Sequence, residues 1–221
     1  MRIPGLALTN MLGAQLKSVG TEPPTPTDPK PGYIMYEDFT IAPQGSGLDG
    51  RVPNVKAVNG GSWTSDTTGT FIIQSGSLRV NVVNRMSQYE IGTNDLFEIE
   101  MTSANDNVLD RWLAMAFAAN TYNNFVEVRW DFSRARVFCR VRSNGSWTFV
   151  AQQGGVTFNP GDKLRCKVEG TNLRVFVNGT AVTTFVVSAS FLRATTSVGL
   201  ATYQNDNGNT PMISDFGVKL L

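Results

Sequence analysis

Short runs of alternating apolar and polar residues, separated by turns rich in glycine and asparagine, fill the chain from Tyr33 onward. Strand side chains point alternately to two faces, so this period of two predicts strands with one buried and one polar face. The predicted inward positions of the clearest runs are Phe97, Ile99 and Met101; Val126, Val128, Trp130 and Phe132; Val137, Cys139 and Val141; and Leu164, Cys166 and Val168. No run in this region has a helical period. The pattern predicts an all-β protein of two antiparallel sheets.

Two Asn-Gly pairs predict tight hairpin turns. Asn144-Gly145 follows one alternating run, and Asn178-Gly179 follows the run Leu173–Val177. Two-residue hairpin turns need positive φ at both central positions, which asparagine and glycine tolerate. We therefore expect the strands on either side of each pair to be antiparallel neighbours.

The first 32 residues have a different character. Five of the ten prolines fall between Pro23 and Pro31. Proline fixes φ and lacks a backbone donor, so residues 23–32 are predicted to form a stiff, extended spacer. The expected organisation is an N-terminal arm at 1–22, this spacer, and one β-domain at 33–221.

The arm is too short to build a core of its own, so it is either a disordered terminus or a segment that a partner orders. Its candidate anchoring side chains are Leu6, Leu8, Met11, Leu12 and Leu16. Pro4, Thr9 and Asn10 interrupt the apolar run at the start, which argues against a secretory signal peptide. Of the two interpretations, the assembly anchor is favoured.

Composition removes several classes of chemistry. The chain contains no histidine. Catalytic Ser-His-Asp and Cys-His arrangements and histidine-based zinc sites are excluded for that reason. The 19 basic and 18 acidic residues nearly cancel, so we expect no nucleic-acid partner. No stretch approaches the roughly 20 apolar residues that cross a bilayer, so no membrane partner is expected.

Two cysteines cannot build a disulfide scaffold. Cys139 and Cys166 fall at inward positions and are expected to be buried thiols, although a bond between them is open if their strands are neighbours. No cofactor is predicted. Calcium is not excluded, because it needs only oxygen ligands, which Asn105-Asp106-Asn107 and Asp110 could supply.

Several segments together resemble concanavalin A-like lectin/glucanase (LamG-like) jelly rolls, especially those of tailed-phage virion proteins. In chain order they are Tyr36–Thr40, Leu48–Arg51, Gly60–Thr64, Asn120–Val128, Leu173–Thr180, Ser197–Tyr203 and Ile213–Val218. The resemblance implies a two-sheet antiparallel jelly-roll sandwich whose first and last strands are neighbours. Phe39 and Phe216 are then expected to approach one another in the core.

The resemblance and the arm together favour a non-enzymatic virion structural protein of a tailed phage. The expected location is the virion, as a capsid decoration or tail-appendage protein docked on other virion proteins through residues 1–22. Self-association is also open. The first alternative is a carbohydrate-binding module that recognises a cell-surface glycan, and the second alternative is a glycoside hydrolase.

The hydrolase alternative rests on Glu98 and Glu100, whose side chains share one strand face. Some hydrolases of this fold carry a Glu-x-Asp-x-x-Glu strand, and paired carboxylates can hydrolyse glycosides. Here Glu100 replaces the middle Asp, and Ser103 stands where the third carboxylate belongs. The favoured interpretation is that Glu98 and Glu100 pair with arginines across the sheet.

A ligand or partner face is predicted from basic and aromatic residues. Nine basic and four acidic residues lie between Glu127 and Arg174, and most of the basic ones alternate with inward apolar residues. They are expected to gather on one exposed face, either as a solvated surface or as a site for an anionic partner. Aromatic and amide groups of two loops could add sugar contacts. The candidate residues are Arg129, Arg140, Arg142, Arg165, Tyr122, Asn123 and Tyr203.

Overall fold

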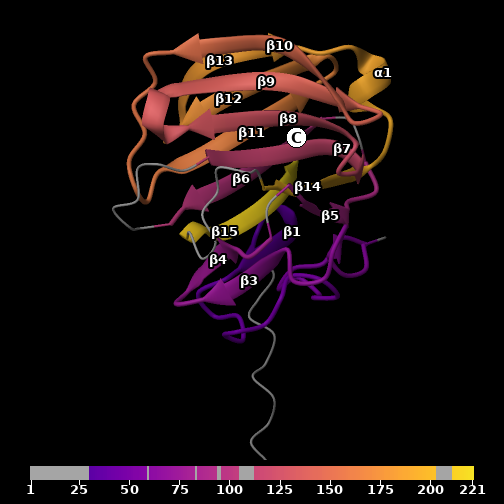
Figure 1. The fold of residues 1–221 in the computed structure, drawn as a ribbon, viewed down its shortest axis with the longest axis vertical. Coiled ribbons are helices and arrows are strands. Elements are labelled where there is room, and N and C mark those ends of the chain that lie inside the picture. Colours follow the sequence, from indigo (N-terminus) through magenta and orange to yellow (C-terminus); the bar gives the residue numbers. More distant parts are fainter. Residues whose placement is uncertain (1–29, 59, 83, 94–95, 105–111, 203–210) are drawn as a thin grey trace, which may run out of the picture.

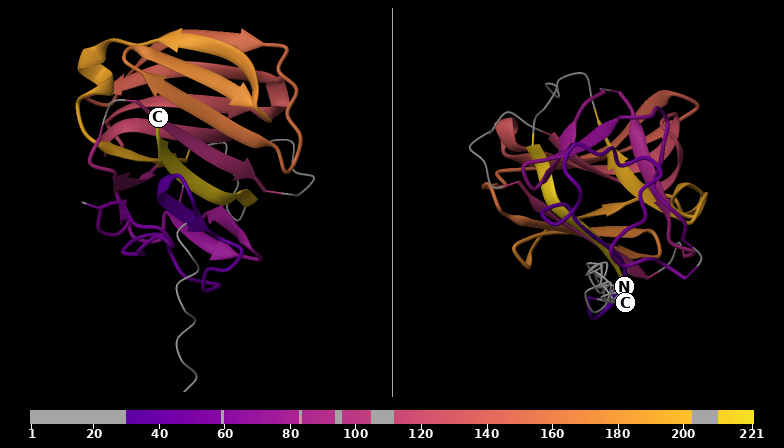
Figure 2. Two further views of the ribbon diagram at one scale, coloured as in Figure 1. Left: turned by 180° about the vertical axis from the view of Figure 1, so that it is seen from behind. Right: turned by 90° about the horizontal axis from the view of Figure 1, so that it is seen from below.

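The computed structural model describes residues 30–58, 60–82, 84–93, 96–104, 112–202 and 211–221. Two antiparallel sheets pack face to face over this part of the chain (Figure 1). The seven-stranded sheet faces the viewer in Figure 1, and the eight-stranded sheet faces the viewer in the left panel of Figure 2. The predicted two-sheet jelly-roll sandwich is confirmed.

The seven-stranded sheet has the strand order β10-β9-β8-β7-β14-β5-β2. Its strands are β2 (Thr64–Ser65), β5 (Met86–Glu90), β7 (Trp112–Thr121), β8 (Asn124–Asp131), β9 (Arg136–Ser143), β10 (Ser146–Gly154) and β14 (Ser197–Ala201). The 3-10 turn η1 (Phe132–Arg134) connects β8 to β9, and the short helix α1 (Ala189–Leu192) precedes β14.

The eight-stranded sheet has the order β13-β12-β11-β6-β15-β4-β3, and β1 pairs with β15 as well. Its strands are β1 (Tyr33–Asp38), β3 (Phe71–Gln74), β4 (Ser77–Val80), β6 (Phe97–Ser103), β11 (Lys163–Glu169), β12 (Asn172–Val177), β13 (Thr180–Val186) and β15 (Pro211–Leu220). The long strand β15 pairs with β6 along one edge, and its other edge is shared between β4 and β1.

The inner faces of the two sheets form one apolar layer. Every inward position predicted above from the alternation is buried. The ring centroid of Trp63 lies 5.7 Å from that of Tyr89 on β5 and 5.5 Å from that of Phe216 on β15. The loop that carries Trp63 therefore meets both strands in this layer. Burial of aromatic and aliphatic side chains is the main favourable contribution to folding of such a sandwich.

Both Asn-Gly pairs form the predicted hairpin turns. The φ angles are +48° at Asn144, +80° at Gly145, +49° at Asn178 and +82° at Gly179. The turns join β9 to β10 and β12 to β13, and each pair of strands is antiparallel.

The first and last strands are neighbours, as the resemblance implied. Glu37 lies opposite Phe216, and the Phe39 amide donates to the Ser214 carbonyl at 3.0 Å. Phe39 and Phe216 are both fully buried. On the outer side of β15, a Cβ at Gly217 would lie 2.3 Å from a ring carbon of Tyr33. Glycine is therefore required where the tyrosines of β1 cross β15.

Cys139 and Cys166 are buried, free thiols. Cys139 lies on β9 of the seven-stranded sheet, and Cys166 lies on β11 of the eight-stranded sheet. The pairing that the sequence left open is therefore not made, and the two strands are not neighbours within a sheet.

Candidate functional site

The predicted basic face is divided between the two sheets. Arg140 and Arg142 lie on β9 of the seven-stranded sheet, whereas Arg165 lies on β11 of the eight-stranded sheet. The outer faces of two packed sheets point in opposite directions, so the expectation of one basic face was wrong. Alternation within a strand tells which residues point outward, but it does not tell to which sheet the strand belongs.

The prediction that Arg129 lies on an exposed face was also wrong. Its side chain is only 1% exposed, and the neighbouring outward residues Glu127 and Asp131 are fully buried. β8 lies between β7 and β9, and the larger side chains of β9 cover it. The Arg129 guanidinium carbon lies 5.4 Å from the Phe138 ring centroid, and its Nε lies 3.5 Å from a Glu127 oxygen. Arg129 is thus part of a buried ion-pair layer and is not an exposed ligand contact.

Three aromatic rings meet on the outer face of the seven-stranded sheet, beside the β7–β8 and β9–β10 turns. The Phe125 ring centroid lies 5.9 Å from that of Tyr122 and 5.5 Å from that of Trp147, the second contact being edge-to-face. Phe125 is buried, whereas Tyr122 and Trp147 are half-buried. Phe125 therefore supports two rings that reach solvent.

Two arginines stack on these rings. The Arg140 guanidinium carbon lies 3.6 Å from the Trp147 ring centroid. The Arg142 guanidinium carbon lies 4.1 Å from the Tyr122 centroid and 5.2 Å from that of Trp147. Cations over aromatic faces are attracted by the ring quadrupole, and Arg also stacks through its planar group. We call Tyr122, Phe125, Arg140, Arg142 and Trp147 the aromatic–arginine cluster.

The two turns beside the cluster are held together by amide groups. The Gly145 amide donates to the Asn123 carbonyl at 3.0 Å, and the Asn144 amide donates to Asn124 Oδ1 at 2.9 Å. Asn123 is exposed, so its side-chain amide is available at the rim. The sequence-predicted Tyr122, Asn123, Arg140 and Arg142 are therefore brought together by the structure.

A pocket of about 270 Å³ lies next to the cluster and shares Phe125 and Arg142 with it. Its other lining residues include Asn120, Asn124, Ser143, Phe191 and Thr195. The lining combines amide and hydroxyl groups with aromatic surface, which is the usual composition of a small-molecule site.

Trp147 is not among the ligand-contact residues predicted from the sequence. The signal was present, because a two-residue turn at Asn144-Gly145 places Trp147 directly opposite Arg142 on the neighbouring strand, as the structure shows. Cross-strand neighbours on one face are close enough to interact. The predicted turn therefore fixes the strand register that brings Arg142 and Trp147 together.

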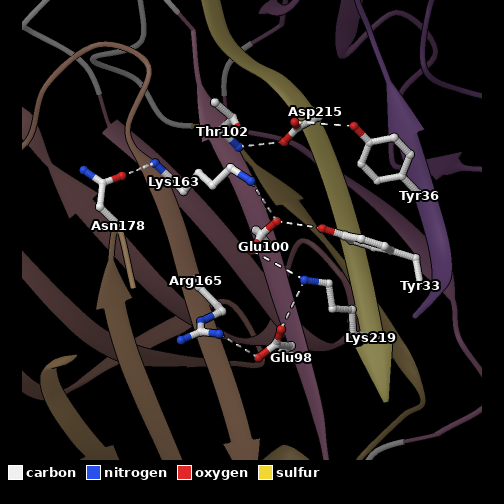
Figure 3. Close-up of polar contacts among 10 residues, drawn as sticks. All are labelled: Tyr33, Tyr36, Glu98, Glu100, Thr102, Lys163, Arg165, Asn178, Asp215 and Lys219. Atoms are coloured by element: carbon white, nitrogen blue, oxygen red, sulfur yellow. Dashed lines mark hydrogen bonds and ion pairs between the residues drawn. The ribbon is translucent and has the colours of Figure 1, made fainter. Parts of the chain in front are cut away.

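Glu98 and Glu100 lie on the other outer face of the sandwich, on β6 (Figure 3). Glu98 forms ion pairs with Arg165 at 3.4 Å and Lys219 at 3.5 Å. Glu100 lies 3.6 Å from Lys219 and 3.7 Å from Lys163. The interpretation of these carboxylates as cross-strand ion-pair partners is confirmed, with lysines supplying more of the contacts than arginine.

Tyr33 completes this network by donating its hydroxyl to Glu100 at 2.6 Å (Figure 3). Burial raises the pKa of Glu100, but the Tyr33 hydrogen bond and the charges of Lys219 and Lys163 outweigh it, so the pKa is lowered. Burial and the Glu100 contact raise the pKa of Tyr33 above its ordinary range, which keeps the hydroxyl a donor. The general acid of a glycosidase needs a raised pKa, whereas the pKa of Glu100 is lowered.

Several predicted candidates lie outside the described residues. These are Tyr203, the possible calcium ligands at 105–107 and 110, and the anchoring residues Leu6, Leu8, Met11, Leu12 and Leu16. Within the described ranges, no cluster of three or more Cys, Asp or Glu side chains could hold a metal ion. Among the helical segments described there, none has the length and apolar character of a membrane span.

Comparison of the sequence with protein-family models and with curated proteins gives no match. The structure, however, is similar to solved structures. The carbohydrate-binding module CBM66 from Bacillus subtilis superposes with a TM-score of 0.51 at 14% identity, over 80% of this chain and 97% of that one. This similarity shows the fold. It is a jelly roll.

Two galectins align less closely, each at 14% identity. Galectin LEC-6 from Caenorhabditis elegans has a TM-score of 0.45 over 65% of this chain and 90% of its own. Sheep galectin-11, solved with glycerol, has a TM-score of 0.47 over 58% of this chain and 93% of its own.

Replacing Tyr33 by Phe should lower the free energy of unfolding by about 1–2 kcal/mol near neutral pH, because a hydrogen bond to a charged carboxylate is lost. A lowered folded-state pKa means that the stability contributed by Glu100 is present above its ordinary pKa and is lost as pH falls through the folded value. The difference between wild type and variant should therefore shrink in acid. Urea unfolding across this pH range measures it.

Tyr36→Phe is the matched control. Its hydroxyl lies 3.5 Å from Asp215 Oδ2, a longer contact than that of Tyr33, so a smaller loss is expected. Equal losses for the two variants, or a Tyr33→Phe effect that does not change with pH, would contradict the assigned role of the Tyr33–Glu100 bond.

Proposed function

We propose that this protein is a non-enzymatic, carbohydrate-binding jelly roll whose glycan site is the aromatic–arginine cluster. The observation that carries the proposal is the meeting of half-buried Tyr122 and Trp147 with stacked arginines at one end of a sheet face. Exposed amides of the adjoining turns, including Asn123, border these rings. The groups come from β8, β9, β10 and the β7–β8 turn, so the fold itself assembles them.

The chemistry of the cluster suits a sugar. Pyranose rings present apolar C–H faces and a rim of hydroxyl groups. An aromatic ring with a partly exposed face can pack against such a C–H face. Asparagine amides can donate hydrogen bonds to the hydroxyl groups and accept them, and guanidinium groups can donate to them. The arginines and the buried Phe125 hold the rings in place, which reduces the entropy that a ligand must offset on binding.

The fold supports the same proposal. The Bacillus module that shares this fold is named as a carbohydrate-binding module, so a jelly roll of this kind can serve glycan recognition. Similarity at 14% identity says nothing about which residues do so here. The placement of the site therefore rests on the cluster alone.

The hydrolase alternative receives no support from the carboxylates that suggested it. Glu98 and Glu100 are both engaged by cations of neighbouring strands, and Tyr33 caps Glu100. They also lie on the eight-stranded sheet, on the opposite outer face from the aromatic–arginine cluster. We propose that they stabilise the sheet and take no part in a reaction.

Trp147→Ala and Tyr122→Ala should each weaken glycan binding about tenfold or more, because aromatic anchors dominate small binding surfaces. A glycan array identifies ligands of the wild type, and isothermal titration with the best ligand measures each variant. Phe176→Ala is the matched control, since its ring also lies beneath an arginine, Arg165, at 4.2 Å, but on the other outer face. Unchanged affinity in both cluster variants would place the site elsewhere.

No polysaccharide that binds the protein should be hydrolysed by it. Reducing ends released over long incubation are the measurement, with Glu98→Gln and Glu100→Gln variants assayed alongside the wild type. All three proteins should match the blank. Turnover by the wild type that disappears in either variant would establish a glycosidase and refute the non-enzymatic proposal.

Display on a tailed-phage virion, with residues 1–22 held by other virion proteins, is a second proposed role. The favouring observation is the position of Lys30, where the spacer joins the domain. Its Nζ lies 3.6 Å from the Tyr36 ring centroid and 5.0 Å from that of Tyr33, beside the outer face of the eight-stranded sheet. The aromatic–arginine cluster lies on the opposite outer face, so an anchor at the arm leaves the cluster accessible. The compared structures lend the virion role no support.

Deletion of residues 1–22 tests this second role. The shortened chain should remain folded, because the described core begins after residue 30, and it should no longer co-sediment with purified phage particles. The full-length Trp147→Ala variant is the control, since it should join the particles normally. Retained incorporation of the shortened chain would contradict anchoring by the arm.

A further inference from the structure

Arg142 differs from the other arginines of its sheet face in lacking a carboxylate partner. Arg140 and Arg129 contact Glu127, and Arg136 and Arg134 contact Asp131. Among the described residues, no carboxylate oxygen lies within 4 Å of the Arg142 guanidinium.

The segment from β8 to β9 supports the same conclusion by composition. Residues 124–143 contain five arginines and only two carboxylates. Both carboxylates are fully buried against the other four arginines. The excess positive charge of this segment therefore lies at Arg142, which is half-buried at the end of β9. The nearby carboxylate of Asp66 interacts with Arg142 through space, but among the described residues the two form no ion pair.

The Arg142 guanidinium is held in one orientation. Its carbon lies 4.1 Å from the Tyr122 ring centroid and 5.2 Å from that of Trp147. Its Nε donates to the Gly145 carbonyl at 3.2 Å. A guanidinium fixed by stacking and by one hydrogen bond retains its positive charge and loses little further freedom on binding an anion.

We propose that the glycan bound by the aromatic–arginine cluster is acidic, and that Arg142 binds the carboxylate of a sugar acid residue. The inference rests on the proposed function and names its ligand class. A planar guanidinium matches a planar carboxylate and can bind it through two parallel hydrogen bonds. Tyr122 and Trp147 would pack beside the sugar ring, and Asn123 at the rim would meet its hydroxyls. A neutral glycan would leave this charge unused.

The test is a glycan array that contains neutral, carboxylated and sulfated glycans, followed by titration of the best ligand. The full-length wild type should bind carboxylated glycans most tightly, and its affinity for them should fall as salt is added. Arg142→Gln should weaken that binding about 10- to 100-fold. Arg142→Lys keeps the charge but loses the planar pair of donors, so it should recover only part of the affinity.

Arg165→Gln is the matched control, because Arg165 also stacks on an aromatic ring and lies on the outer face of the other sheet. It should bind carboxylated glycans like the wild type, and thermal unfolding verifies that each variant is folded. Preference for neutral glycans, preference for sulfated glycans without carboxylates, or full affinity in Arg142→Gln would each overturn this inference while leaving glycan binding intact. Absence of any glycan binding would instead refute the proposed function.

Discussion

The architecture depends on one constraint, which is that the apolar layer between the two sheets admits a charged side chain only when it is paired. Glu37 of β1 lies opposite the core residue Phe216 and is fully buried, and Arg51 pairs with it at 2.8 Å. The charged side chains of the central strands are directed to the two outer faces. On the central strands those faces are themselves covered by neighbouring side chains, so Glu127 and Asp131 are fully buried although they point away from the core. Buried charges need partners, and arginines of the adjacent strand and turn supply them.

This constraint separates the parts of each face that stabilise the sheet from the parts that can bind. The centre of each outer face is occupied by paired charges, such as Glu98 with Arg165 and Lys219. The proposed ligand contacts lie at a margin, where strands end and turns begin. Tyr122 and Trp147 lie at such a margin. Cross-strand packing in the sheet positions them, while the turns keep them open to solvent.

The alternation of residues and the Asn-Gly turns were sufficient to predict the strands, the inward residues and the two hairpins. They could not predict that Arg140 and Arg165 lie on opposite faces, because the connection between β10 and β11 passes from one sheet to the other without a periodic signal. Nor could they predict the burial of Arg129, since the covering side chain of Phe138 belongs to a neighbouring strand. Trp147 opposite Arg142 was predictable from the turn register, but its edge-to-face contact with a third ring, Phe125, was not.

The two cysteines carry a consequence for where such a domain can work. Burial raises the pKa of both thiols above their ordinary range, and the thiolate is the form that oxidants and disulfides attack. Cys139 and Cys166 also belong to different sheets, and the apolar layer between the sheets shields them. The folded domain therefore needs no disulfide, and neither of its cysteine sulfur atoms is an exposed thiolate. A domain of this kind can therefore fold in a reducing compartment without forming a disulfide.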